Sequence, residues 1–338
     1  MSHLLEVKNL SVAFPTEDGL VQATDDLSFH VDLGETLAIV GESGSGKSVS
    51  SMAIMGLHNP KTTKISGQVL ISSLGHSTDV VTASSEEVRR LRGGTVSMIF
   101  QDPMSALHPY FTIGNQIAEA WLLHNDGTKD DARKKAIEML DLVGISDAKN
   151  RVDSYPHQFS GGMRQRVMIA MALVNHPKIL IADEPTTALD VTVQAQILKL
   201  LKDMQREFNM AVILITHDLG VVAEVADRIN VMYAGRLVEE GPVNEIYKNP
   251  VHPYTIGLLA SVPRVDQAHG TRLKTIPGQP PSLISLPGGC AFEPRCEFAK
   301  FVPDNRCKTT RPEVQEKLPG HLARCHLSAS QVLEVKAR

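Results

Sequence analysis

The residues best suited to chemistry lie in the stretch GESGSGKS at positions 41–48, which we call the phosphate loop. Its glycines permit backbone conformations that turn several N–H groups toward one anion. In the pattern G-x-x-x-x-G-K-[ST], the lysine, here Lys47, reaches the β- and γ-phosphates of a nucleotide, and the final hydroxyl, here Ser48, can ligate Mg²⁺. At average residue usage, the bare pattern arises by accident in about one chain in a hundred of this length. The loop therefore predicts a nucleotide site.

The sequence on either side of the phosphate loop supports this interpretation over a chance glycine-rich turn. Residues 36–40 read as a short buried strand, and residues 48–57 have the pattern of a helix. A loop between a strand and a helix places the positive N-terminal end of that helix against the phosphates.

Two acids follow another apolar run, in the segment ILIADEP at 179–185. Ligands of parallel α/β sheets bind at the carboxyl ends of strands, so Asp183 would hold Mg²⁺, directly or through water. Glu184 would polarise the attacking water. A solvent-facing acid pair is the alternative, which the phosphate loop disfavours. A glycine pair in FSGGMRQR at 159–166 opens a helix, either as a second anion site or as a simple N-cap by Ser160.

All four cysteines of the chain lie between residues 290 and 325. Disulfides are disfavoured in a cytoplasmic chain, and small loop-rich segments commonly fold around a metal. Four thiolates suit tetrahedral Zn²⁺ or an iron–sulfur cluster, although the spacing lacks the paired C-x2-C of structural zinc sites. Four unligated thiols are the remaining alternative. His321 and His326 are possible replacements for a missing ligand, but the plainer expectation is that they are surface histidines. The four cysteines are Cys290, Cys296, Cys307 and Cys325.

The chain has 338 residues, enough for about two domains, and a formal net charge of −4. With no basic stripe, this charge argues against a nucleic-acid partner. The longest apolar runs, at 167–174 and 211–215, are far too short to span a bilayer. The first residues lack the apolar core of a secretory signal, so we expect a cytoplasmic location.

Strands that alternate with helices predict a mainly parallel α/β sheet. The expected strands are 4–14, 34–40, 95–100, 178–185, 210–218 and a hairpin-like pair in 228–241, and further helices are expected at 161–177 and 191–208. A helical subdomain at about 105–165 would be inserted in a first domain, 1–250. Proline and glycine become dense after residue 250, so residues 251–338 are expected to form a second, loop-rich domain.

Several short motifs occur in a fixed order along the chain. They are Gly41–Ser48, Gln101 in MIFQDP, FSGGM at 159–163, LIADEP at 180–185, ALD at 188–190 and His217 in ITHD. Together they resemble the ATP-binding-cassette (ABC) ATPases over roughly residues 4–245, although Phe159 and Met163 depart from the usual L-S-G-G-Q signature. The resemblance implies an α/β P-loop NTPase with a RecA-like core, an antiparallel β edge and an inserted helical subdomain.

The same resemblance implies a head-to-tail pair of cassettes with ATP between the phosphate loop of one and the SGG segment of the other. Glu184, Gln101 and His217 would be catalytic; Gln101 would sense Mg²⁺ and the attacking water, and His217 would contact the γ-phosphate. Phe14 would stack on adenine, and Asp190 would organise the dimer interface. The expected nucleotide-binding residues are Phe14, Gly41, Ser43, Gly44, Ser45, Gly46, Lys47, Ser48, Val49, Ser160, Gly161, Gly162 and Asp190. The expected Mg²⁺ ligands are Ser48, Gln101 and Asp183.

Longer segments, including GESGSGKSVSSMAIMGL and NPVHPYTIGLLASVPR, resemble the ATPase subunits of dipeptide and oligopeptide importers almost from end to end. One departure is His108, where that branch usually shows an asparagine. The resemblance implies a [4Fe–4S] cluster on the four cysteines, with Zn²⁺ as the alternative. It also implies a second, related ATPase subunit in a heterodimer, two membrane permease subunits and an extracytoplasmic solute-binding protein, at the cytoplasmic face of the inner membrane.

Two other functions are weighed against peptide import. The same machine could import nickel or another small solute, because the cassette never touches the cargo. A soluble cassette ATPase acting on nucleic acid or ribosomes is disfavoured, because no heptad run lies between Lys47 and Ser160 and the chain carries one cassette.

Overall fold

The computed structural model describes residues 3–73, 75–262 and 275–337. The chain forms two compact units. The first consists of Met1–Leu5, Val31–Thr36 and Leu70–Ile215, and the second consists of Glu6–His30, Leu37–Val69 and Thr216–Arg338. Neither unit begins or ends at residue 250. The division into domains 1–250 and 251–338 stays a prediction. Within the described residues, the chain has no helix with the length and apolar character needed to cross a membrane.

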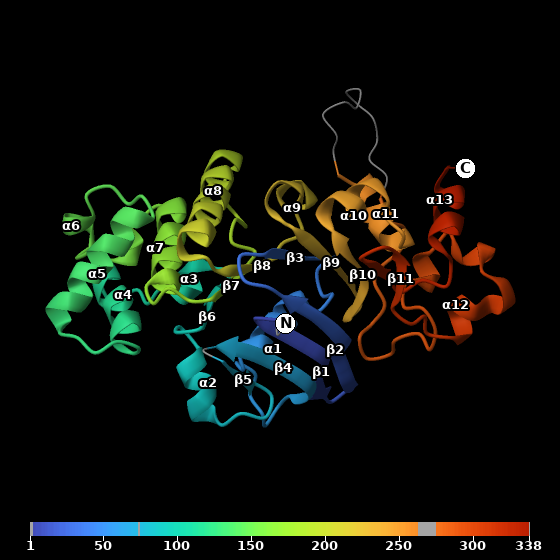
Figure 1. The fold of residues 1–338 in the computed structure, drawn as a ribbon, viewed down its shortest axis with the longest axis horizontal. Helices are drawn as coiled ribbons and strands as arrows, with labels where there is room; N and C mark the ends of the chain where they lie inside the picture. The colour runs from blue at the N-terminus through green and yellow to red at the C-terminus, as the bar shows by residue number, and fades with distance from the viewer. Residues whose placement is uncertain (1–2, 74, 263–274, 338) are drawn as a thin grey trace. The chain divides into compact units, whose positions relative to one another are not determined.

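The first unit contains three parallel strands, as the alternation of strands and helices predicts (Figure 1). They are β6 (Val96–Ile99), β7 (Ile179–Asp183) and β8 (Ala211–Ile215). Ile179 pairs with Val96 on one side and with Ala211 on the other. Every residue of β7 is buried, which is the pattern of a parallel strand covered on both faces. Asp183, the last residue of β7, is therefore a carboxylate at the end of an apolar strand.

The stretch of chain that connects β6 to β7 is helical, where the sequence predicts a helical insertion (Figure 1). They are α3 (Pro103–Ala106), α4 (Ile113–Leu122), α5 (Lys129–Leu142), α6 (Ala148–Arg151), the 3₁₀ turn Pro156–Gln158 and α7 (Gly161–Leu173). Side-chain caps fix several of their starts: Thr112 accepts from the Asn115 N–H, and Thr128 forms a capping box with Asp131. After β7, α8 (Val191–Phe208) covers the range expected from its periodicity. The unit also holds β5 (His76–Asp79) and α2 (Ser85–Leu91).

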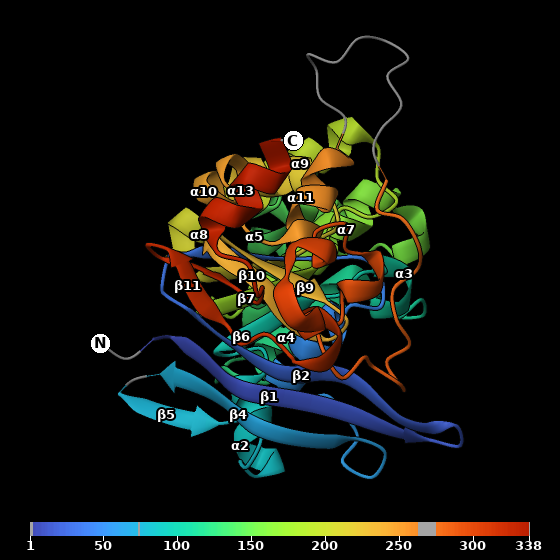
Figure 2. The same cartoon turned by 90° about the vertical axis from the view of Figure 1, so that its right-hand side faces the viewer.

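The second unit holds the neighbouring strands β1, β2 and β4, which lie side by side in Figure 2. They are β1 (Leu5–Thr16), β2 (Gly19–Val31) and β4 (Lys64–Ser73). Leu5, Val31 and the end of β4 from Leu70 belong to the first unit. Residues 17 and 18 alone join β1 to β2, and so short a connection makes an antiparallel hairpin. An antiparallel β edge is what the family resemblance implies.

The other sheet strands of the second unit run in the order β3-β9-β10-β12-β11. They are β3 (Thr36–Val40), β9 (Arg228–Tyr233), β10 (Arg236–Pro242), β12 (His321–Ala323) and β11 (Gln315–Leu318). β3 and β9 are parallel, whereas the other pairs are antiparallel. The last two strands come from the region expected to be a loop-rich domain of its own. The described part of that region also holds the helices α11 (Pro253–Ala260), α12 (Arg306–Thr309) and α13 (Ala329–Ala337) and three 3₁₀ turns.

A buried carboxylate joins the C-terminal region to β10. Glu239 is 1% exposed, and its carboxylate accepts hydrogen bonds from the N–H groups of Val251 (2.6 Å) and His252 (3.0 Å). The Nε2 of His321 lies 2.7 Å from the same carboxylate. The expectation that His321 is a surface histidine is therefore wrong, because the β12–β10 pairing buries it completely. These bonds fix the start of α11 (Pro253–Ala260), next to α10 (Val243–Lys248) in the chain.

His252 caps α11 in its neutral form. Its Nδ1 accepts a hydrogen bond from the Tyr254 N–H at 3.1 Å, so that nitrogen carries no proton. Burial lowers the pKa of His252 to about 4, outweighing the Glu239 carboxylate, which favours the charged form. Lys317 lowers the pKa further.

Acid should therefore destabilise the fold through His252. Its folded pKa lies below the ordinary value near 6.5, so the stabilisation is complete above pH 6.5 and is lost as the pH falls toward 4. We expect the free energy of unfolding to fall by about 2 kcal/mol from this group between about pH 7.5 and 5. Urea midpoints at the two pH values measure it. The His252→Asn variant keeps a capping acceptor but does not titrate, so its free energy of unfolding should fall less over the same pH range. An equal fall in the variant and the wild type would contradict the assignment.

Candidate functional site

The phosphate loop has a backbone that its glycines alone permit. It joins β3 to α1 (Lys47–Ile54), the order expected from the sequence. Gly46 has φ +98°, and a Cβ there would lie 2.3 Å from the carbonyl oxygen of Ala23. A Cβ on Gly41 would lie 2.2 Å from the carbonyl oxygen of Met232. Substitution at either glycine would push the loop away from β2 or β9.

The polar side chains of the loop are arranged as a phosphate site requires. The buried Lys47 ammonium donates to the carbonyl oxygens of Gly41 (2.9 Å) and Glu42 (3.1 Å), so it lies along the loop. The buried Ser45 hydroxyl has no hydrogen-bond partner among the described residues. A buried hydroxyl of this kind is costly unless a ligand satisfies it, so the loop fits a bound phosphate. Ser43, Gly44 and Ser48 are exposed, and Val49 is half-buried.

Two other predicted nucleotide contacts belong to the second unit. Phe14 is half-buried on β1 and meets the His58 ring edge-on, with 5.6 Å between ring centroids. His217 is exposed in the turn between β8 and α9 (Leu219–Val225). The stacking of Phe14 on adenine and the contact of His217 with the γ-phosphate stay predictions.

The first unit brings Gln101 and Glu184 together. The Gln101 amide donates to Glu184 Oε2 at 2.9 Å, and the Thr187 hydroxyl donates to the same oxygen at 2.9 Å. Glu184 has a left-handed backbone, φ +47°, so its side chain leaves the line of β7 just after the buried Asp183. The geometry holds the carboxylate of the predicted base in one place. Thr187 escaped the sequence reasoning, although its position three residues after the acid pair is a typical turn spacing.

The SGG segment has a structural role in the first unit. Ser160 caps α7 by accepting from the Met163 N–H at 3.4 Å, as the N-cap interpretation predicts. A Cβ on Gly162 would lie 2.8 Å from Val193 of α8, so that position needs a glycine for packing. Asp190 likewise caps α8 and accepts from the N–H groups of Thr192 and Val193 at 3.0 Å. Ser160 and Gly161 are nevertheless exposed, and their contact with a partner cassette stays a prediction.

The four cysteines of the second unit line one small pocket. Burial is the first cause that raises all four thiol pKa values, and the charges of neighbouring cysteines raise them further, to about 11 for Cys290 and about 12 for Cys296. The backbone closes tightly around the pocket: the Cys290 N–H donates to the Cys307 carbonyl at 2.8 Å, and a Cβ on Gly289 would lie 2.2 Å from that oxygen. Phe292 and Phe298 are among the other residues that line it.

All four cysteines line this one pocket, and thiols are the donor set that Zn²⁺ or an iron–sulfur cluster requires. A single Zn²⁺ with bonds of about 2.3 Å would need its sulfurs within about 4.6 Å of one another. Among the described residues, no three cysteine sulfurs all lie within 4.8 Å. The four sulfurs therefore do not form a preassembled tetrahedral site for one Zn²⁺ ion.

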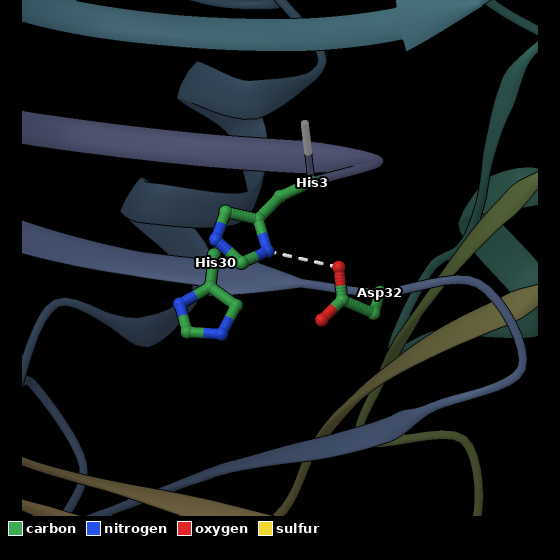
Figure 3. A group of neighbouring side chains, drawn as sticks. All are labelled: His3, His30 and Asp32. Atoms are coloured by element: carbon green, nitrogen blue, oxygen red, sulfur yellow. Dashed lines mark hydrogen bonds and ion pairs between the residues drawn. The ribbon is translucent and has the colours of Figure 1, made fainter. Parts of the chain in front are cut away.

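One other set of possible metal ligands, His3, His30 and Asp32, is drawn in Figure 3. The Nδ1 of His3 lies 2.9 Å from the Asp32 carboxylate, which makes a hydrogen bond. His30 is engaged in the second unit, where its Nε2 lies 3.0 Å from Nη1 of Arg228. A guanidinium at a histidine nitrogen repels a cation, so we assign no metal to these residues.

Comparison with known families gives two matches along the chain. The ABC transporter family matches residues 24–187, which include the phosphate loop and the acid pair. The family described as "Oligopeptide/dipeptide transporter, C-terminal region" matches residues 238–301, which include Glu239 and the first two cysteines.

Individual relatives match almost the whole chain. The oligopeptide transport ATP-binding protein OppD of Haemophilus influenzae is 50% identical over 98% of this chain and 99% of its own length. The dipeptide transport ATP-binding protein DppD of Bacillus subtilis is 52% identical over 97% of this chain and 95% of its own. A solved dimeric ATP-binding cassette with bound ADP and phosphate has a TM-score of 0.62 and 28% identity, over 71% of this chain and 98% of its own.

Thr187 should act on hydrolysis through Glu184. Thr187→Val removes the hydroxyl that holds the carboxylate, so we expect the kcat for ATP hydrolysis to fall about tenfold while KM stays nearly constant. Thr187→Ser, which keeps the hydroxyl, should retain most of the rate. Steady-state phosphate release measures both, with Glu184→Gln as the reference for loss of the base. An equal loss in the serine and valine variants would contradict the role of the hydrogen bond.

Proposed function

This chain belongs to the ATP-binding subunits of ABC transporters, is an ATPase, and on that premise we propose that it powers the import of dipeptides or oligopeptides. The observation that carries the proposal is the match of the whole chain, C-terminal region included, to relatives named for peptide transport. Nickel or another small solute as cargo is the alternative that the experiment below separates.

The proposed reaction is transfer of the ATP γ-phosphate to water. The phosphate loop would hold the phosphates with its N–H groups, Lys47 and the unsatisfied Ser45 hydroxyl. Ser48, Gln101 and Asp183 would hold Mg²⁺, which when bound neutralises charge that develops on the phosphate oxygens. Glu184, held by Gln101 and Thr187, would orient and polarise the attacking water.

The remaining proposed contacts involve His217, which would bind the γ-phosphate, and Phe14, which would stack on adenine. A second cassette would supply Ser160–Gly162 to the γ-phosphate, with Asp190 near the interface. The exposure of Ser160 and Gly161 supports this arrangement, because a capping role alone does not require exposure. We propose a second, related ATPase subunit as that partner.

We also propose two membrane permease subunits and an extracytoplasmic solute-binding protein as partners, with this chain at the cytoplasmic face of the inner membrane. Large apolar side chains near Gln101 support a permease-binding surface. Met104 is 61% exposed, Tyr110 is 83% exposed and Phe111 is 53% exposed, all within ten residues of Gln101. Clustered exposed apolar groups of this kind mark interaction sites.

A [4Fe–4S] cluster on Cys290, Cys296, Cys307 and Cys325 is the proposed occupant of the cysteine pocket, with Zn²⁺ as the alternative. Four thiolates would hold such a cluster, and the group would join short segments between residues 290 and 325. Because the thiols have raised pKa values, binding should release protons.

Protein purified without oxygen should therefore be brown and should contain about four iron atoms and four sulfides per chain. Cys307→Ser should lose most of the colour and the iron and should unfold at a lower temperature, because the segments lose their common ligand. Metal analysis and thermal unfolding measure the two effects. A colourless protein with one zinc per chain would contradict the cluster and support the alternative.

The cargo is tested in the complete transporter. ATPase activity of the complex in liposomes should rise when the binding protein is loaded with dipeptides or oligopeptides and should stay basal with nickel or sugars. Glu184→Gln is the control, in which cargo should produce no hydrolysis. Stimulation by nickel or a sugar alone would keep the ATPase assignment and overturn the peptide cargo.

A further inference from the structure

An arginine of the C-terminal region binds a glutamate of the phosphate loop. Nη1 and Nη2 of Arg295 lie 2.7 Å and 3.0 Å from the two carboxylate oxygens of Glu42, which is a bidentate pair within the second unit. Glu42 is the first variable position of the pattern G-x-x-x-x-G-K-[ST]. Neither the predicted site nor the family matches assign Arg295 a role.

The Arg295 guanidinium is held by further hydrogen bonds and by two aromatic rings. Its Nε donates to the Pro277 carbonyl at 2.8 Å, and Nη1 also lies 3.3 Å from the Tyr233 hydroxyl. The guanidinium carbon lies over the rings of Tyr233 and Phe292, at 5.7 Å and 5.9 Å from their centroids. The side chain is only 5% exposed, against 28% for Glu42. A rigid, buried cation of this kind fixes the position of the carboxylate that it binds.

A second contact holds the backbone of the same loop residue. The Glu42 N–H donates to the Tyr254 hydroxyl at 2.9 Å, and the Glu42 carbonyl accepts from Lys47. Tyr254 is completely buried. It lies in the first turn of α11, whose start is fixed by His252 and Glu239. Glu42 is therefore held at its N–H group and at its carboxylate by residues that follow position 250.

We propose that Arg295 and Tyr254 are positioning residues for ATP binding: both hold the phosphate loop in its binding shape, and Arg295 also neutralises the Glu42 carboxylate of that loop. The inference rests on ATP binding by the phosphate loop and is independent of the cargo.

The two contacts lower two different costs of binding. A preformed loop spends less free energy on ordering when the phosphates bind. An unpaired carboxylate on the phosphate loop would repel the negatively charged phosphates, whereas one paired with a guanidinium would repel them much less. The second effect makes a signed prediction: the part of the loss that comes from charge repulsion should disappear when Glu42 also loses its charge.

The experiment is a titration of full-length chains with ATP and Mg²⁺ by calorimetry. We expect Arg295→Ala to raise the Kd for ATP about tenfold and Tyr254→Phe to raise it about threefold. The double variant Arg295→Ala with Glu42→Gln should recover most of the loss seen in Arg295→Ala. Arg295→Lys, which keeps the charge without the bidentate fork, should lie between the wild type and Arg295→Ala.

Arg311→Ala is the matched control, because Arg311 is also an arginine of the C-terminal region but pairs with Asp25 and Asp26 instead of Glu42. It should leave the Kd unchanged. Thermal unfolding without nucleotide identifies variants that fail to fold; if Arg295→Ala fails, Arg295→Lys and Tyr254→Phe carry the test. Wild-type affinity in those variants, or no recovery in the double variant, would overturn the proposal. Absence of ATP binding by the wild type would instead overturn the nucleotide site itself.

Discussion

The buried carboxylate of Glu239 is the interaction on which the second unit depends. A carboxylate that is 1% exposed costs several kcal/mol unless its oxygens are satisfied, and here two N–H groups and the His321 ring satisfy them. These bonds fix the turn before α11 and the pairing of β12 with β10. Tyr254 then lies in α11, so one buried charge determines where a phosphate-loop contact is found.

The local parts of the site could be predicted from the sequence. The glycines of the phosphate loop, the acids at the end of β7 and the start of α8 each depend on a few neighbouring residues, and the structure has them where the pattern predicts. The pairing of β11 and β12 with the sheet could not be predicted, because it joins residues some 80 positions apart in strands of three or four residues. The contact of Arg295 with Glu42 was missed because the two residues are also far apart in sequence. In addition, Glu42 stands at a position where the pattern accepts any residue.

Several residues of the predicted nucleotide site also have ordinary structural tasks. Ser160 and Asp190 cap helices, and Gly162 makes room for Val193. These tasks and a role at a cassette interface are compatible, because capping uses the helix N–H groups whereas the interface would use the exposed side. A loss of activity after substitution at these positions therefore has two physical origins, and only the stability of the variant separates them.

The bidentate contact of Arg295 with Glu42 makes the phosphate loop depend on residues that follow position 250. A chain cut after residue 250 would keep every motif from Gly41 to His217, and a motif search would score it as complete. It would nevertheless leave the Glu42 carboxylate without its cation and the Glu42 N–H without its acceptor. A fragment that carries all the cassette motifs can thus be too short to supply every hydrogen-bond and charge partner of the phosphate loop.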